Sequence, residues 1–271
     1  MYRENSIDIL TYFLNLPVAD SHEIYQKFSA LPWAVVGVGN QPLERFVYIP
    51  GTKKDALLLV AHTDTVWDAA YGKAVQTTAA YKDGMFYSTN PACGIGADDR
   101  AGCAMLWALR NSGHSLLLVD GEEKGKRGAH YLRKHNPKLF RKLNAHQFMI
   151  ELDWRGTGGC LYNQVENTQA FKDYISSHLG FQDSHQKGGC DLQVLCQKIC
   201  GVNIGVGYHN NHHTTEILNV AEWENTYQVL SAFLQQEHPK FPIPVSKQLK
   251  AQLRRCKSKC GSILRKLKLK K

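Results

Sequence analysis

The stretch ALLLVAHTD, residues 56–64, is a run of apolar residues that ends in polar ones. A short, continuous apolar run of this kind is typical of a strand buried on both faces of a sheet. His62 and Asp64 come at its carboxyl end, where open α/β sheets gather the residues that bind ligands. The stretch therefore predicts a central strand with polar side chains at its carboxyl end that could bind a ligand.

Two later segments repeat this pattern. HSLLLVDGEE, residues 114–123, ends in Glu122 and Glu123. HQFMIELDWRG, residues 146–156, brings Asp153 to the end of a third apolar run. Because the carboxyl ends of parallel strands meet at one edge of a sheet, we expect these acids to share a crevice with the polar end of the first strand.

Segments with helical spacing alternate with these strands. They are residues 6–16, 21–31, 100–110, 127–135, 168–180, 188–201 and 220–236, with further strands at 45–51 and 202–213 and a hairpin at 81–89. Ser21 is the expected N-cap of the second helix. The alternation predicts an α/β fold, in which a mixed, mostly parallel sheet is sandwiched between helices as one catalytic domain.

The chain has 271 residues and a formal net charge of +9, which comes from its end. Residues 246–271 contain 11 Lys or Arg and no acid, so the rest has 33 − 11 = 22 basic against 24 acidic residues. We therefore expect a domain over residues 1–243 and a basic tail over residues 244–271. The tail could be a solvated extension, a segment attracted to nucleic acid or an anionic membrane, or a helix docked on an acidic partner.

The remaining composition predicts a cytoplasmic protein. No run of about 18 apolar residues is present, and the N-terminus does not resemble a secretory signal. The eight cysteines are scattered, which suits a reducing compartment. Cys196 and Cys200, like Cys256 and Cys260, lie four residues apart, so we expect free thiols on one face of a helix.

GIGADDRAG, residues 94–102, sets Asp98 and Asp99 side by side between glycines. Taken alone, the pair is explained by a helix N-terminus, where acids complement the helix dipole. The strand ends have similar explanations when each is taken alone: a hydrogen-bonded core histidine for His62, and acids at a helix start for Glu122 and Glu123. The histidines 209, 212 and 213 alone could form a solvated loop or an adventitious metal binder.

Together these residues favour a different interpretation. His, Asp and Glu without Cys are the ligands expected of a hydrolytic zinc site that keeps an open position. A site with two metal ions needs two ligands for each ion, a bridging carboxylate and a spare carboxylate for the proton of the water. The candidate residues satisfy that count.

The motifs also resemble those of the co-catalytic zinc exopeptidases, which include peptidase T, the aminoacylase-1 and carboxypeptidase G relatives, and lidless zinc aminopeptidases. The matching motifs, in order, are AHTDTV (61–66), GADDRAG (96–102), DGEEKGKRGA (120–129), ELD (151–153), GGCD (188–191) and HHTTE (212–216). The resemblance runs from about residue 5 to residue 236. It implies a two-zinc centre, with Co²⁺ or Mn²⁺ as alternative metals.

The resemblance implies a role for each metal-site residue. His62 and Asp153 would hold one zinc ion, and Asp98 would bridge both ions. Glu123 and a histidine near the C-terminus would hold the second ion. His212 is favoured, because relatives place a glutamate four residues after this ligand and Glu216 lies there; His213 and His209 are the alternatives.

Two further acids match catalytic positions of the family. Asp64 matches the carboxylate that orients the ligand histidine, and Glu122 matches the general base that moves protons to and from the water and the leaving amine. The family also has a cis peptide bond after the bridging aspartate, so we expect one between Asp98 and Asp99.

The chain departs from the lidded relatives in several places. Only residues 154–187 separate ELD from GGCD, which is too short for a lid or dimerisation domain. Arg100 replaces the usual lysine, a change expected to be neutral on a helix surface, and Cys190 replaces a small hydroxyl residue. Asp191 is expected to cap or anchor a helix near the site. Tyr208 and Arg155 are candidates for substrate contact.

The sequence thus predicts a zinc-dependent exopeptidase, an aminopeptidase or a di- or tripeptidase, whose metal-bridging water attacks a peptide bond. The missing lid favours recognition of a free amine. An N-acyl amino acid deacylase or a carboxypeptidase is the enzymatic alternative, so the substrate is a short peptide or an acylated amino acid. The alternative from another class is a non-catalytic metal-binding protein that engages nucleic acid or membrane through its tail.

Overall fold

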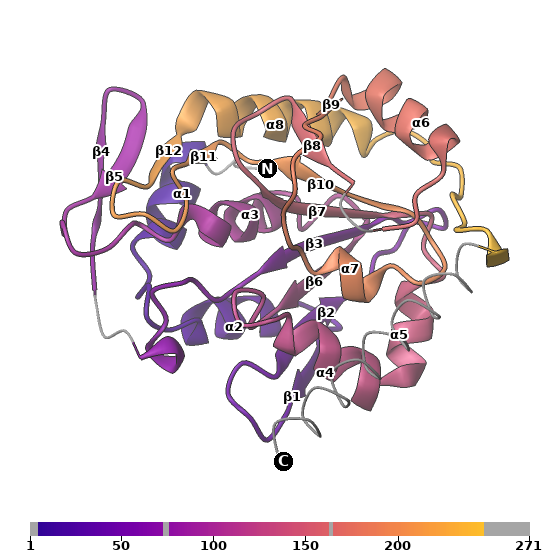
Figure 1. Cartoon of the computed structure of the whole chain (residues 1–271), viewed down its shortest axis with the longest axis horizontal. Helices are drawn as coiled ribbons and strands as arrows, with labels where there is room; N and C mark the ends of the chain where they lie inside the picture. The colour runs from indigo at the N-terminus through magenta and orange to yellow at the C-terminus, as the bar shows by residue number, and fades with distance from the viewer. Residues whose placement is uncertain (1–4, 73–75, 163–164, 247–271) are drawn as a thin grey trace, which may run out of the picture.

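The computed structural model describes residues 5–72, 76–162 and 165–246. An eight-stranded sheet runs through the middle of this part of the chain, in the order β1-β2-β6-β3-β7-β10-β8-β9 (Figure 1). The strands are β1 (Val35–Val38), β2 (Arg45–Ile49), β3 (Leu58–His62), β6 (Ser115–Val119), β7 (Met149–Trp154), β8 (Gly159–Leu161), β9 (Gln182–Asp183) and β10 (Gly201–Gly205).

The four central strands of this sheet, β6, β3, β7 and β10, are parallel to one another. Strands β1, β2 and β8 add antiparallel pairs, while β9 is parallel to β8. All residues of β3, β6 and β10 are buried, as continuous apolar runs require in a sheet covered on both faces. The predicted mixed, mostly parallel sheet is confirmed.

Helices cover both faces of the sheet (Figure 1). One face carries α1 (Ser6–Leu14), α2 (His22–Ser29), α3 (Ala97–Ala108), α6 (Gln169–Leu179) and α8 (Val220–Phe233), and the other carries α4 (Arg127–His135), α5 (Pro137–Leu143) and α7 (Leu192–Leu195). A short 3₁₀ helix, η1, spans Ala69–Tyr71. No helix in the described ranges is long and apolar enough to cross a membrane.

A second, antiparallel sheet of four strands lies beside the start of α3, in the order β11-β12-β5-β4. Its strands are β4 (Ala79–Lys82), β5 (Met85–Ser88), β11 (Tyr208–His209) and β12 (Ile217–Asn219). The predicted hairpin is its β4–β5 pair, which turns at Asp83 and Gly84 with φ of 51° and 82°. The β11–β12 pair holds the histidine loop between these strands at the end of the main sheet.

The helix expected over residues 188–201 is wrong for most of its length. Only Leu192–Leu195 is helical, and Cys196 is already extended, because the chain has to turn there into β10. Cys196 and Cys200 therefore do not share a helical face, although both are buried, free thiols. Cys256, Cys260 and residues 247–271 of the expected tail lie outside the described residues.

Residues 154–187 do not form a separate domain in the part that is described. They contain β8, α6 and β9, and the two strands extend the edge of the main sheet beyond β10. Residues 163 and 164 of this segment lie outside the described ranges. The described residues of this segment therefore form no lid over the carboxyl edge of the sheet.

Arg100 and Ser21 differ from the expectation. Arg100 is 1% exposed, and its guanidinium donates hydrogen bonds to the carbonyl oxygens of Leu16 (3.1 Å) and Asp20 (3.1 Å). It ties α3 to the α1–α2 connection, so it is not on a helix surface. Ser21 stands at the N-cap of α2 without capping it. Its hydroxyl instead accepts a hydrogen bond from Arg45 at 2.7 Å.

Candidate metal centre

The first cluster of candidate ligands forms where β3, α3 and β7 meet. His62 is the last residue of β3, Asp98 lies in the first turn of α3, and Asp153 lies near the end of β7. His62 Nε2 is 3.0 Å from Asp98 Oδ1 and 3.5 Å from Asp153 Oδ1. All three residues are buried. The convergence follows from the parallel pairing of β3 and β7, which places their carboxyl ends together.

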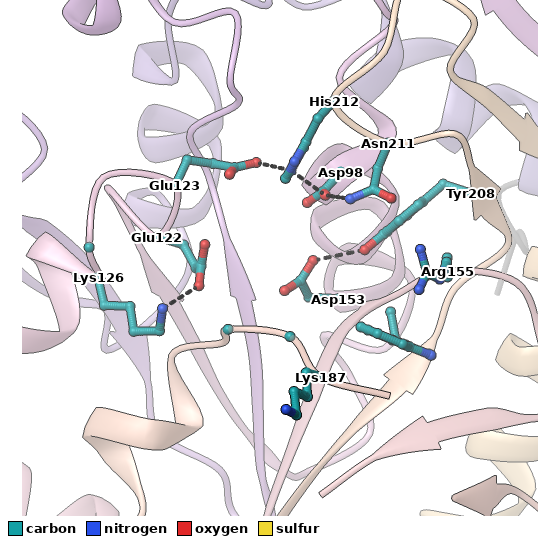
Figure 2. Close-up of a pocket in the computed structure, with 14 residues that line it drawn as sticks. Asp98, Glu122, Glu123, Lys126, Asp153, Arg155, Lys187, Tyr208, Asn211 and His212 are labelled. Carbon is teal, nitrogen blue, oxygen red and sulfur yellow. Dashed lines mark hydrogen bonds and ion pairs between the residues drawn. The ribbon is translucent and has the colours of Figure 1, made fainter. Parts of the chain in front are cut away.

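The second cluster lies on the other side of Asp98. His212 Nε2 is 2.8 Å from Glu123 Oε1 and 3.1 Å from Asp98 Oδ2. Figure 2 shows Glu123 and His212 pointing toward one another across the rim, with Asp98 below them. The two oxygens of Asp98 thus face two different histidines, as a bridging carboxylate requires.

This geometry distinguishes which of the three candidate histidines can be a ligand of the second cluster. His209 Nε2 contacts Glu222 Oε2 at 2.8 Å instead of the acidic cluster. His213 has no side-chain contact with the cluster among the described residues, whereas His212 contacts two of its acids. Glu216 is not a candidate ligand, because its carboxylate accepts hydrogen bonds from the backbone N–H groups of Gly96 (2.7 Å) and Asp98 (3.1 Å).

The loop before α3 carries Asp98 in an unusual backbone conformation. The peptide bond between Asp98 and Asp99 is cis, which confirms the expectation. Gly96 has φ of 66°, and a Cβ there would lie 2.9 Å from Thr65 Cγ2, so a glycine is needed. Asp99 accepts hydrogen bonds from the backbone N–H groups of His62 (3.1 Å) and Gly102 (2.9 Å). Asp99 thus anchors the loop, while Asp98 faces the histidines.

Asp64 lies behind the first cluster and connects it with the second. Its Oδ1 is 3.3 Å from His62 Nδ1, and its carboxylate accepts the backbone N–H groups of Glu122 (3.0 Å) and Glu123 (3.3 Å). The Tyr71 hydroxyl also donates to it. A carboxylate behind a ligand histidine fixes the ring orientation, so the position fits the orienting role that the resemblance implies.

Three polar groups of the site were not predicted in their observed roles. Asn211 Nδ2 donates to Asp98 Oδ2 at 2.8 Å, and the Tyr208 hydroxyl donates to Asp153 Oδ1 at 3.1 Å (Figure 2). Lys126 Nζ lies 2.9 Å from Glu122 Oε1, an ion pair between residues four apart. The DGEEKGKRGA motif contained Lys126, but its spacing did not reveal the pairing, because Lys126 precedes α4 with φ of 60°.

Asp191 differs from its expected role as an anchor. It stands at the N-cap of α7 without a side-chain cap bond, and its buried carboxylate has no hydrogen-bond partner among the described residues. Glu151 anchors this helix instead, since it accepts the backbone N–H groups of Asp191 (3.0 Å) and Leu192 (3.4 Å). Burial raises the pKa of Asp191, and the neighbouring charge of Glu151 raises it further.

The electrostatics of the acidic groups indicate a place for cations. Burial raises the pKa of Asp153 well above its ordinary value, and the charge of Asp98 adds to the effect. Burial also acts to raise the pKa of Asp98, but hydrogen bonds from His212 and His62 hold it well below the ordinary value. Buried carboxylates packed this closely need positive charge near them.

The residues present fit a metal ion. Candidate ligand atoms of His62, Asp98 and Glu123 lie within 4.8 Å of one another, and those of His62, Asp99 and Asp153 do the same. Asp99 is already occupied by backbone N–H groups, so Asp153 is the available acid of the second group. Imidazole nitrogen and carboxylate oxygen are suitable ligands for Zn²⁺, and also for Mn²⁺ or Co²⁺.

The two clusters open into a cavity of about 380 Å³. Its acidic side is formed by Asp98, Glu122, Glu123 and Asp153, and its wall continues through Trp154 and Tyr208. Figure 2 shows Glu122 on the opposite wall from Tyr208, with Asp98 and Asp153 between them. A group bound in this cavity would lie against both clusters and Glu122 at once.

Comparisons with known proteins agree with this fold. The model of peptidase family M28 matches residues 46–188. The aminopeptidase PepT from Bacillus cereus has a TM-score of 0.62 and 14% identity over 87% of this chain and 98% of that chain. A tripeptidase from Staphylococcus aureus has the same TM-score and identity over 87% of this chain and 100% of its own.

The TET1 peptidase of Pyrococcus horikoshii, which can assemble into a tetrahedron or a large octahedral shell, is also similar. Its TM-score is 0.59, with 13% identity over 85% of this chain and 99% of that chain. A search of curated protein sequences gave no significant match. At these identities the structural likeness shows the fold alone.

Proposed function

The chain belongs to peptidase family M28, and from this premise we propose that it is a zinc-dependent exopeptidase of short peptides. The observation that carries the proposal is the position of Asp98, whose two oxygens lie 3.0 Å from His62 Nε2 and 3.1 Å from His212 Nε2. Two sites that share one carboxylate are the arrangement a two-metal hydrolase needs.

The proposed site has a role for each residue. His62 and Asp153 would hold one ion, Glu123 and His212 the other, and Asp98 both. Two divalent ions bound there would polarise the scissile carbonyl and lower the pKa of the attacking water. Asp64 would keep the His62 ring in its orientation.

Glu122 is the proposed general base. It lines the cavity, is not part of either ligand cluster, and would take a proton from the attacking water and return it to the leaving amine. Its Oε1 is paired with Lys126 Nζ at 2.9 Å. Lys126 thus holds the carboxylate at the wall of the cavity.

Mass-spectrometric profiling of a short-peptide library tests the proposal. We expect zinc-loaded protein to release terminal residues and chelated protein to release none. Glu122→Gln should lower turnover by at least about 100-fold, the usual contribution of a general base, while both metal ions stay bound. Lys134→Gln, an exposed change on α4, is the control. Unchanged turnover in Glu122→Gln would refute the assignment of the base.

The library also separates the alternative activities. Peptides with a blocked amine would be spared by an aminopeptidase, and peptides with a blocked carboxyl would be spared by a carboxypeptidase. An N-acyl amino acid deacylase would cleave acylated amino acids. If two ions bind and no substrate changes, the non-catalytic alternative is favoured, and the tail can then be tested by the salt dependence of nucleic-acid or membrane binding.

A further inference from the structure

The wall of the cavity that lies away from the two clusters carries positive charge. Lys126, Arg155 and Lys187 line the cavity together with the acids. Lys126 is neutralised by its ion pair with Glu122. Arg155 and Lys187 have no carboxylate partner among the described residues, so two positive charges at this wall are left without a counterion.

These two residues lie on neighbouring segments that contact each other. Arg155 directly follows β7, and Lys187 lies in the connection between β9 and α7. The Arg155 guanidinium stacks 4.9 Å from the Trp154 ring centroid and donates a hydrogen bond to Gln186, next to Lys187. Figure 2 shows Arg155 beside Asp153 on the Tyr208 side of the cavity, and Lys187 below Asp153.

The acids of the cavity, in contrast, already have partners. Asp98 and Asp153 contact His62, Glu123 contacts His212, and Glu122 contacts Lys126. The cavity lining includes no fifth carboxylate in the described part of the chain that could receive the amine of a substrate. The free charges of the cavity are therefore suited to an anion and not to an ammonium group.

We propose that Arg155 and Lys187 form a carboxylate-binding subsite, which selects short substrates with a free carboxylate. This rests on the proposed peptidase function. Arginine and lysine bind carboxylates through charge-assisted hydrogen bonds, and the Trp154 stack orients the guanidinium plane. A cavity of about 380 Å³ is near the lower end of ordinary ligand sites, so di- and tripeptides or N-acyl amino acids fit better than long chains.

The carboxylate could belong to the C-terminus of the substrate or to an acidic side chain, and matched substrates distinguish the two. We would compare the kinetics of the zinc-loaded protein on three substrates. They are a dipeptide, the C-terminal amide of that dipeptide, and a dipeptide amide whose second residue is glutamate. A preference of about tenfold or more for the free dipeptide over its amide identifies the C-terminus. Recovery of activity in the amidated glutamate substrate identifies the side chain.

Lys187→Gln and Arg155→Gln test the subsite itself. Each should raise KM for the carboxylate substrate by about tenfold or more, change kcat little, and leave the amide substrate unaffected. Lys134→Gln removes one positive charge on α4 and should change neither substrate. Equal losses on the carboxylate and amide substrates would overturn the proposal.

A binding measurement keeps this proposal separate from the proposed function. Calorimetry would compare N-acetylglycine with N-acetylglycinamide, on zinc-loaded protein and on both variants. Preferential binding of the acid that is lost in the variants supports the subsite even if no peptide is hydrolysed, in which case the peptidase function alone fails. Turnover of peptides together with equal binding of acid and amide refutes the subsite and leaves the peptidase function intact.

Discussion

Histidine side chains lie at both ends of the central sheet, and their surroundings differ in charge. At the carboxyl end of β3, His62 lies against Asp98 and Asp153. Before the amino end of β6, His114 Nδ1 accepts the Leu57 N–H at 2.9 Å. His238 lies at the same end, with its ring 4.4 Å from that of Phe233.

The two environments shift the histidine pKa in opposite directions. Burial lowers the pKa of His114, and it lowers the pKa of His238 to about 4. Burial also acts to lower the pKa of His62, but the charge and hydrogen bond of Asp153 and further bonds from Asp64 and Asp98 raise it well above the ordinary value. A buried histidine of this sheet is thus neutral unless carboxylates surround it, as they surround His62 at the carboxyl end.

The largest expected effect comes from removing the carboxylate shared by both clusters. Asp98→Ala should abolish binding of at least one metal ion and lower turnover by more than about 1,000-fold, because Asp98 contacts both His62 and His212. Metal content and peptide turnover measure the effect. Asp173→Asn, an acid of α6 outside the cavity, is the control. Two tightly bound ions in Asp98→Ala would contradict the bridging role.

The two histidines of the candidate centre should differ in their effect on folding. His62 is 1% exposed, so His62→Asn should lower the stability of the metal-free protein by about 1–3 kcal/mol, because it disrupts a buried network. The His212 side chain is 45% exposed, and its replacement by Asn should change stability by less than about 0.5 kcal/mol. Urea unfolding measures both values.

Metal binding by the same variants tests whether His212 is a ligand. His212→Asn should retain one ion per chain and bind the second more weakly. His209→Asn is the matched control, since His209 lies in the same loop but contacts Glu222. Loss of the second ion in His209→Asn, with normal binding in His212→Asn, would transfer the ligand role to His209.

The candidate site at the carboxyl end of the sheet was predictable because its residues follow apolar strands. His62, Glu123 and Asp153 are each within four residues of a buried run, so strand polarity alone places them at one edge. The resemblance added the cis bond at Asp98 and the preference for His212, which strand pattern cannot supply. The fold class follows from the same alternation of strands and helices.

The features that were missed depend on long-range contacts. The burial of Arg100 depends on carbonyl oxygens 80 and 84 positions before it. The anchoring role expected of Asp191 is taken by Glu151, 40 positions before it. Outside Leu192–Leu195, most of the helix expected over residues 188–201 is irregular backbone, because the chain turns there into β10. Local patterns do not contain this information.

The smallest predicted effect concerns the amino end of the sheet and its response to pH. The folded pKa of His238 is about 4, and an unfolded histidine has a pKa of about 6.5. The unfolded chain therefore binds a proton first as the pH falls, so this contribution to stability is present above about pH 6.5 and is lost between about pH 6.5 and 4. The loss amounts to at most about 3 kcal/mol.

His238→Phe should reduce this acid dependence, because phenylalanine keeps the contact with Phe233 and cannot bind a proton. The variant also loses the hydrogen bond between the Tyr174 hydroxyl and His238 Nδ1 (3.0 Å), which costs about 1 kcal/mol at neutral pH. Urea unfolding of the metal-free wild type and of metal-free His238→Phe at several pH values gives the difference in their free energies of unfolding. The contributions of His62 and His212 are the same in both proteins and cancel in this difference. If the free energies of unfolding of the two proteins change with pH in parallel, His238 is not the acid-sensitive group. The difference in histidine pKa between the two ends of the sheet then does not include His238.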